Sequence, residues 1–193
     1  MLKTKWINKK INYDGTQLRS LFAYLDHRVL GDSVVAFRGS CDVNFDHMVD
    51  GEDLLEKSRI QGSDMIHFIF EIFDRPLIVG VLLQRLFASI AGDVIHELSK
   101  KDFTIRRSGD DLYFDFGANK KNRKLSISIA TRSTNSVLIH FAVNISNSGT
   151  PVPTACLNDL GLQPRKFAEA CLLRVQSEYN SIIEATQKVK AVT

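Results

Sequence analysis

Apolar and polar residues alternate along several stretches of the chain, and this alternation predicts β-strands. In residues 65–73 every second position is apolar, and His67 and Glu71 lie on the opposite face, which is the period of two expected of a strand. Similar stretches recur later in the chain and are bounded by turn residues. The predicted strands are a short first strand near the N-terminus and residues 33–37, 65–73, 103–107, 111–116, 124–131 and 137–145.

Apolar residues spaced three or four apart predict helices in other parts of the chain. Residues 77–98 keep this spacing along their whole length and follow Pro76, a residue type favoured at the start of a helix. A final helix is expected to begin at Pro164. The pattern also predicts a helix within residues 14–31 and a short helical turn at 52–57.

The order of these elements predicts the fold class. A strand and a helix are followed by several strands, a long helix, an antiparallel series of strands and a last helix, which is typical of an α+β fold with helices packed on one face of a mainly antiparallel sheet. The chain has 193 residues, of which 44% are hydrophobic, enough for one domain to bury a sizeable core. We therefore expect residues 1–193 to form a single domain.

The hairpin predicted within residues 124–145 has one apolar face and one face of short polar residues. Leu125, Ile127 and Ile129 are expected to point into the core. A solvated sheet face normally carries long charged side chains, whereas short polar ones leave room for a molecule to lie against the sheet. We interpret the polar face as the floor of a pocket, and a plain solvated face is the alternative. Its residues are Lys124, Ser126, Ser128, His140 and Asn144.

Composition and charge narrow the class of protein. The formal net charge is +3, with the positive residues in short clusters, so the sequence does not indicate a nucleic-acid-binding protein. The three cysteines lack paired spacing and form no CxxC motif, which favours reduced thiols in the cytoplasm and indicates no metal site.

Two features indicate that the protein is neither exported nor inserted in a membrane. Residues 1–10 alternate lysines with single apolar residues and lack the continuous apolar stretch of a secretory signal. The apolar run at 77–83 is interrupted by Gln84 and Arg85, well short of the roughly 20 residues of a membrane span. We expect a cytoplasmic protein.

Four motifs in the second half of the chain resemble the catalytic domain of biotin and lipoate protein ligases. In that superfamily a KWPND-type turn enters a strand, a lysine opens the next strand, a strand ending in N-x-N follows, and a loop leads to the last helix. The corresponding segments are residues 107–113 (RSGDDLY), Lys124, residues 140–146 (HFAVNIS) and residues 154–161. The resemblance implies a fold like that of class II aminoacyl-tRNA synthetases and biotin–lipoate ligases, a small carboxylic acid as substrate, and ATP with Mg²⁺ as cofactor.

Over its whole length the chain also resembles a family of small archaeal and bacterial proteins known as domain of unknown function three-six-six. That family has no established activity, so this resemblance implies a fold and not a reaction. The segments that carry it are residues 13–15, 30–33, 37–39, 48–50, 64–67 and 124–131.

Lys124 is the first candidate catalytic residue. An ammonium group at the head of a strand could neutralise charge on a carboxylate or phosphate, and such electrostatic help is often the largest catalytic contribution. Asp110 and Asp111 could orient Lys124 or hold a metal-bound phosphate. The alternative for this acidic pair is a turn and strand cap.

Other candidate substrate-binding residues come from the first half of the chain. His67 and Glu71 are polar residues in an otherwise apolar strand, and they are either ligand contacts or residues of an edge strand. Ligases of the superfamily hold ATP with a glycine- and arginine-rich loop near the equivalent of Arg38. This chain has Arg38, Gly39 and Ser40 there, and the resemblance implies that they contact the substrate.

Cys156 supports a rival hypothesis. Octanoyl transferases of the superfamily use a lysine and a cysteine, and the cysteine lies in the loop after the N-x-N strand, much where Cys156 follows Asn144. A thiolate activated by Lys124 could accept an acyl group directly. The alternative is that Cys156 is a small apolar residue at a packing position.

The leading hypothesis is therefore a small-molecule-binding protein with a ligase-like site, active in ATP-dependent activation or transfer of a small carboxylic acid. One rival is a transferase that uses Cys156 and takes an acyl group from a carrier. Another is a non-catalytic module that binds a metabolite or a protein partner. A homodimer formed through an edge strand is also expected.

Overall fold

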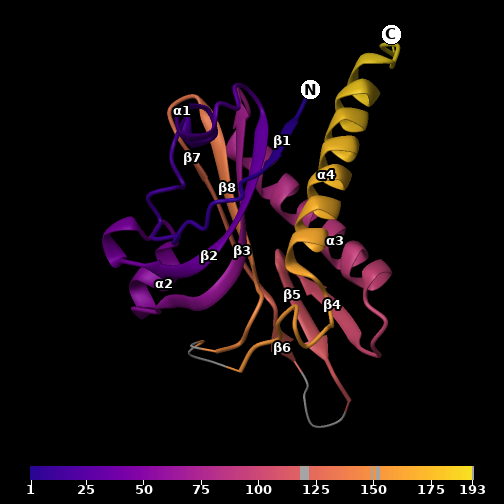
Figure 1. The fold of residues 1–193 in the computed structure, drawn as a ribbon. Coiled ribbons are helices and arrows are strands. Elements are labelled where there is room, and N and C mark those ends of the chain that lie inside the picture. The colour runs from indigo at the N-terminus through magenta and orange to yellow at the C-terminus, as the bar shows by residue number, and fades with distance from the viewer. Residues whose placement is uncertain (118–121, 149, 151–152, 193) are drawn as a thin grey trace.

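The computed structural model describes residues 1–117, 122–148, 150 and 153–192. Figure 1 shows the arrangement of the helices and strands. In chain order they are β1 (Lys3–Trp6), α1 (Phe22–His27), β2 (Ser33–Val43), the 3₁₀ helix η1 (Phe45–His47), α2 (Gly51–Glu56), β3 (Ile60–Phe73), α3 (Leu77–Leu98), β4 (Thr104–Ser108), β5 (Asp111–Asp115), β6 (Arg123–Lys124), β7 (Ser126–Arg132), β8 (Ser136–Asn144) and α4 (Pro164–Gln187).

The strands form two sheets. The larger sheet has the order β1-β2-β3-β8-β7, and the smaller one has the order β4-β5-β6. Only the pairing of β1 with β2 is parallel among these strand pairs; the others are antiparallel. The expected α+β class with a mainly antiparallel sheet is confirmed.

Helices α3 and α4 cover one face of the larger sheet (Figure 1). The core beneath α3 is aromatic: the Phe87 ring lies edge-on to Phe68, with 4.9 Å between centroids, and to Phe141, with 5.0 Å. At Gly80, helix α3 lies so close to β8 that a Cβ would be 2.1 Å from Val137 Cγ1. Helix α3 matches a membrane span in length and composition, but most of its apolar stretch is buried in the protein, as in a core helix.

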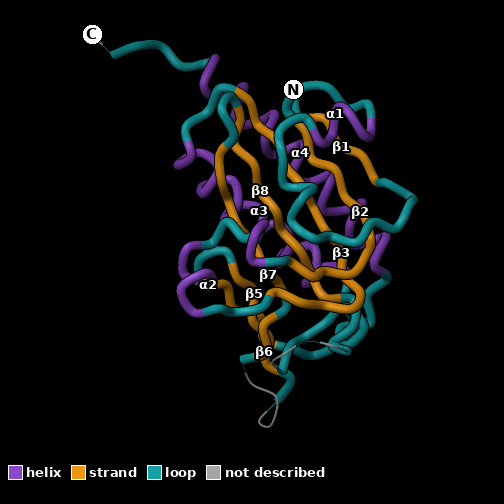
Figure 2. Tube along the Cα trace, turned by 90° about the vertical axis from the view of Figure 1, so that its left-hand side faces the viewer, coloured by secondary structure: helices purple, strands orange, loops and turns teal. Residues whose placement is uncertain are grey.

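The opposite face of the sheet is viewed in Figure 2, where the strands lie in front of α3 and α4. It is covered in part by the N-terminal segment, which forms a second apolar cluster with the sheet. Tyr13 bridges to Cys41 of β2, and Phe22 of α1 packs edge-on against Phe37. This second face is the one that holds the candidate site.

Two predicted elements differ from the structure. The first helix begins only at Phe22, because Leu21 has a φ of 62° and cannot continue a right-handed helix. The predicted strand 124–131 is divided at Leu125, whose N–H donates to Leu112 O and whose carbonyl accepts from Asn144 N. The chain thus passes from the smaller sheet to the larger one at Leu125.

Candidate ligand-binding site

A cavity of about 450 Å³ lies on the second face of the larger sheet. Its floor is formed by β7, β8 and Tyr13, and its walls come from residues 43–61, which include α2, and from the β4–β5 turn. A volume of this size is typical of sites for small molecules. The cavity therefore joins parts of the chain that are far apart in sequence.

Several of the predicted site residues line this cavity, and several do not. Those that line it are Lys124, Asp110, Asp111, Ser126, Ser128, His140 and Asn144. Those outside its lining are Arg38, Gly39, Ser40, His67, Glu71 and Cys156.

The predicted orientation of the β7 side chains is wrong. Ser128 lies directly opposite Phe141 in the hairpin, and directly opposed residues point to the same face of a sheet. Ser126 Oγ consequently accepts from Leu112 N, and Ser128 Oγ accepts from Gln84 Nε2 of α3. Ile127 and Ile129 share the cavity face with His140 instead. The two serines still contribute to the cavity lining.

Lys124 lies among carboxylates at one wall of the cavity. Its Nζ is 2.8 Å from Asp111 Oδ2. Burial raises the pKa of Asp110, and the neighbouring Asp111 carboxylate also contributes to the rise, while Lys124 acts in the opposite direction. Asp110 Oδ2 also accepts from Gln84 Nε2 at 2.9 Å. The lysine charge is thus already paired in this arrangement.

Asp53 of α2 also lines the cavity, and its charge interacts with that of the same lysine. Burial raises its pKa, the Asp50 carboxylate adds to the rise, and Lys124 acts against it. Asp50 accepts at the helix start from the backbone N–H groups of Glu52 and Asp53, as an N-cap does. The carboxylate of Asp53 itself has no hydrogen bond or ion pair with the described residues.

His67 and His140 form a buried pair beneath the cavity. His67 Nε2 donates to Gly39 O at 3.3 Å, because a carbonyl can only accept. Burial lowers the pKa of His67 to about 4 and that of His140 well below its usual value, so both rings are neutral. His67 Nδ1 therefore accepts from His140 Nε2 at 3.0 Å. His140 Nδ1 is then an acceptor without a donor among the described residues.

The ring of Tyr13 stacks on this pair, with 3.7 Å between its centroid and that of His140. Tyr13 and His140 are each only 3% exposed and both line the cavity. Neither Tyr13 Oη nor His140 Nδ1 has a hydrogen-bond partner among the described residues. The floor of the cavity thus holds two polar atoms without partners in that part of the chain.

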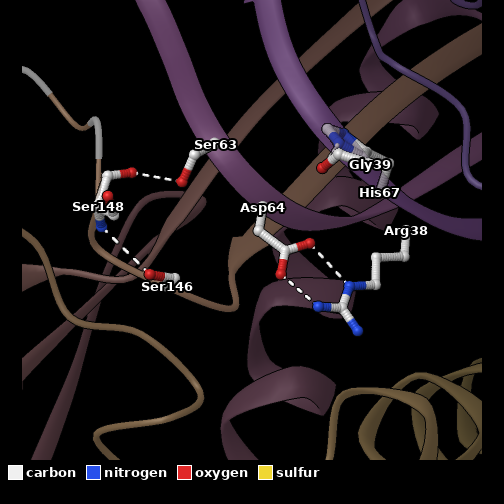
Figure 3. Close-up of polar contacts among 7 residues, drawn as sticks. All are labelled: Arg38, Gly39, Ser63, Asp64, His67, Ser146 and Ser148. Atoms are coloured by element: carbon white, nitrogen blue, oxygen red, sulfur yellow. Dashed lines mark hydrogen bonds and ion pairs between the residues drawn. The ribbon is translucent and has the colours of Figure 1, made fainter.

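Arg38, Gly39 and Ser40 make structural contacts outside the cavity, and Figure 3 shows the first two. The Arg38 guanidinium makes two hydrogen bonds to the Asp64 carboxylate, including Nε to Oδ1 at 2.7 Å. A Cβ at Gly39 would lie 1.8 Å from Ile11 O, so glycine is required where the N-terminal segment crosses β2. Ser40 O accepts from Tyr13 N at 2.8 Å.

Glu71 anchors the N-terminal segment to the sheet. Its carboxylate, on a side chain 3% exposed, accepts from Leu21 N, from Ser20 Oγ and from Ser136 Oγ. Three donors on one buried carboxylate provide the partners that its burial requires. These contacts give Glu71 a structural role at some distance along the strand from the cavity.

Cys156 is buried and held by polar neighbours. Its thiol lies 3.2 Å from Asn147 Oδ1 and 3.2 Å from Asp159 Oδ2. Burial raises its pKa, and the Asp159 carboxylate adds to the rise through its side-chain hydrogen bond and its charge. A protonated thiol is a poor nucleophile.

The cavity is also lined by residues that were not predicted as site residues, among them Tyr13, Asp50, Asp53 and Arg59. The dense charge of residues 42–62 was a signal that this segment differs from the core. The position of residues 42–62 over the sheet could not be derived from the pattern of apolar and polar residues.

Comparison with known proteins places the chain in a family. The model of the family described as "Domain of unknown function (DUF366)" matches residues 2–190. The chain is a member of the DUF366 family. An uncharacterized protein of Methanocaldococcus jannaschii is 33% identical over 164 residues, which cover 82% of this chain and 70% of that one. A protein of unknown function from Pyrococcus horikoshi is 36% identical over all of both chains, with a TM-score of 0.90.

This DUF366 protein also shares its fold with ligases. A mutant of the biotin protein ligase from Aquifex aeolicus, in complex with biotin, has a TM-score of 0.59 at 11% identity, covering 94% of this chain and 72% of that one. The bipartite lipoate protein ligase of Thermoplasma acidophilum has a TM-score of 0.57 at 11% identity, covering 92% and 84%. The predicted resemblance in fold to biotin and lipoate ligases is confirmed.

Proposed function

We propose that this DUF366 protein binds a small organic molecule with a carboxyl group in the 450 Å³ cavity, with Lys124 as its charged contact. The observation that carries the proposal is the position of Lys124, whose partly exposed side chain lines the cavity on a ligase-like fold. An ammonium in a partly desolvated site binds a carboxylate more strongly than it does in water. To do so, Lys124 would exchange or share its contact with Asp111.

The residues of this site do not fit ATP. Among the described residues, five carboxylates line the cavity, those of Asp50, Glu52, Asp53, Asp110 and Asp111, against the cationic side chains of Lys124 and Arg59. A triphosphate would be repelled by this excess of negative charge. Arg38 and Gly39 are used in contacts outside the cavity. Within the described residues, no group of three His, Cys, Asp or Glu side chains is arranged to hold a metal ion.

Acyl transfer through Cys156 receives no support from the geometry. The thiol is 1% exposed, does not line the cavity, and has a raised pKa. We therefore favour reversible binding over a covalent acyl-cysteine intermediate.

A binding experiment tests this proposal. Calorimetric titration with short carboxylic acids should show binding to the wild-type protein and a loss of about tenfold or more in affinity for Lys124→Met, because a charge-assisted contact is removed. The exposed Lys166 of α4 offers a matched control, and Lys166→Met should bind like the wild type. Equal binding by Lys124→Met and the wild type would contradict the assignment of Lys124.

An exchange experiment separates binding from activation. Incubation with ATP, Mg²⁺, labelled pyrophosphate and the bound acid should give no acid-dependent label in ATP. Incorporation of label that depends on the acid would contradict the conclusion that the site does not take ATP.

A further inference from the structure

Polar side chains in both the walls and the floor of the cavity have no hydrogen-bond or ion-pair partner among the described residues. Asp53 is a partly buried carboxylate with no hydrogen bond or ion pair among the described residues. Tyr13 and His140, each 3% exposed, present Oη and Nδ1 without a hydrogen-bond partner in the same part of the chain. These atoms come from three separate parts of the chain and line the same cavity.

The chemistry of His140 Nδ1 is fixed by a chain of hydrogen bonds that starts outside the cavity. Gly39 O determines that the proton of His67 is on Nε2, and His67 Nδ1 then determines that the proton of His140 is on Nε2. His140 Nδ1 can therefore only accept. Because His140 lines the cavity and Nδ1 has no donor among the described residues, this atom favours an occupant that donates an N–H or O–H.

The charge of the walls points to the same kind of occupant. Lys124 is already 2.8 Å from Asp111, and Asp53 has no cation in contact among the described residues. A carboxylic acid that carries no positive charge would add a further negative charge beside Asp50, Asp53 and Asp110. A positive group on the same molecule would offset this repulsion.

We infer that the molecule bound in this cavity is an amino-bearing carboxylic acid, a zwitterion whose protonated amine is the partner of Asp53 and whose donors reach the acceptor His140 Nδ1. The inference rests on the proposed function and adds the second charged end of the ligand. Lys124 binds the carboxylate of the ligand, and Asp53 of α2 binds its protonated amine. Ligands with only one of these groups leave one wall of the cavity without its counter-charge.

Four probes of equal chain length test the inference without any variant. Valerate has a carboxylate, δ-aminovalerate has a carboxylate and an amine, cadaverine has two amines, and glutarate has two carboxylates. Calorimetric titration at neutral pH should rank δ-aminovalerate about tenfold or more tighter than valerate, since it gains one charge-assisted contact. Glutarate should bind most weakly of the four. Valerate binding as tightly as δ-aminovalerate would overturn the inference.

A matched pair of variants on α2 locates the amine. Asp53→Asn removes the charge at almost constant shape, whereas Glu56→Gln removes a charge from the same helix at an exposed position outside the cavity lining. The preference for δ-aminovalerate over valerate should disappear in Asp53→Asn and persist in Glu56→Gln. An unchanged preference in Asp53→Asn would overturn the role of Asp53.

The same titrations separate this inference from the proposed function. Equal binding of valerate and δ-aminovalerate, with both lost in Lys124→Met, would overturn the inference and leave the carboxylate contact standing. Cadaverine binding as tightly as δ-aminovalerate, unaffected by Lys124→Met, would overturn the carboxylate contact and leave the amine contact standing. Failure of all four probes to bind at millimolar concentration would contradict both.

Discussion

His67 Nδ1 accepts a hydrogen bond from His140 Nε2 at 3.0 Å in the interior of the larger sheet. Both residues were singled out by their place in the strand pattern, but only the contact between them shows what they do. His67 is fully buried and touches Gly39 O on its other side. The hydrogen bond from His67 to Gly39 O of β2 thus determines the tautomer of His140 at the cavity floor.

The burial of His67 predicts a pH-dependent stability. Its pKa is lowered from 6.5 to about 4 by burial, so the unfolded chain binds the proton more tightly than the folded protein does. The free energy of unfolding should be constant above about pH 6.5 and fall as the pH decreases from about 6.5 to 4, by roughly 3 kcal/mol for His67 alone. Urea denaturation across this range measures the effect.

Two variants serve as the controls for this pH dependence. His67→Phe should reduce the slope between about pH 4 and 6.5 and leave the part that the buried His140 contributes, whereas a change at the exposed His96, such as His96→Gln, should preserve the whole slope. A slope that is the same in His67→Phe and the wild type would show that other groups cause it.

Release of Lys124 from its ion pair should strengthen ligand binding. Asp111→Asn removes the carboxylate that lies 2.8 Å from Nζ, so the ammonium should bind a carboxylate ligand several-fold more tightly. Stability should change by no more than about 1 kcal/mol, because the pair is partly exposed. Titration with δ-aminovalerate and urea denaturation give the two quantities. Weaker binding by Asp111→Asn would instead indicate that Asp111 orients the lysine.

Removal of the Glu71 charge should weaken the attachment of the N-terminal segment. Glu71→Gln removes the charge that strengthens the hydrogen bonds of three donors to Oε1 and replaces Oε2, which also accepts from Leu21 N, by an amide NH₂ that can only donate. We expect a loss of about 2–3 kcal/mol in unfolding free energy. Glu184→Gln on α4 is exposed and should have no effect. Affinity for the ligand should persist in Glu71→Gln, which would separate the anchor from the site.

Substitution at Gly39 should destabilise the protein. In Gly39→Ala the new Cβ would lie 1.8 Å from Ile11 O, so the N-terminal segment would have to move away from β2. We expect a clear fall in Tm, measured by circular dichroism. Gly51→Ala, where a Cβ meets nothing within 4 Å, is the control and should melt like the wild type.

Cys156 should react slowly in the native protein. The thiol is 1% exposed and its pKa is raised, so iodoacetamide at neutral pH should leave it unmodified until the protein is unfolded. Mass spectrometry of the modified peptides gives the result. Cys156→Ala should bind carboxylate probes as the wild type does. Rapid labelling of Cys156, or loss of binding in Cys156→Ala, would contradict this prediction and support the transferase hypothesis.

The identity and type of the main elements could be predicted from the sequence. The long helix was predicted at 77–98 and lies at Leu77–Leu98, and the strand predicted at 65–73 is the central and final part of β3. Of the candidate site residues, His140 and Asn144 of β8 line the cavity together, because alternation within a strand decides which of its residues share a face. Their contact with a ligand stays a prediction.

The sequence by itself determined which segments form strands and helices and which faces of β3 and β8 are apolar, because these properties depend on periodicity over a few residues. Tertiary structure decided which face Ser126 and Ser128 occupy, because strand pairing aligns Ser128 with Phe141. It also decided that Asp53 lines the same cavity as Lys124 and that Gly39 sets the tautomer of His140. These relationships depend on distances between segments far apart in the chain, and local patterns carry no information about such distances.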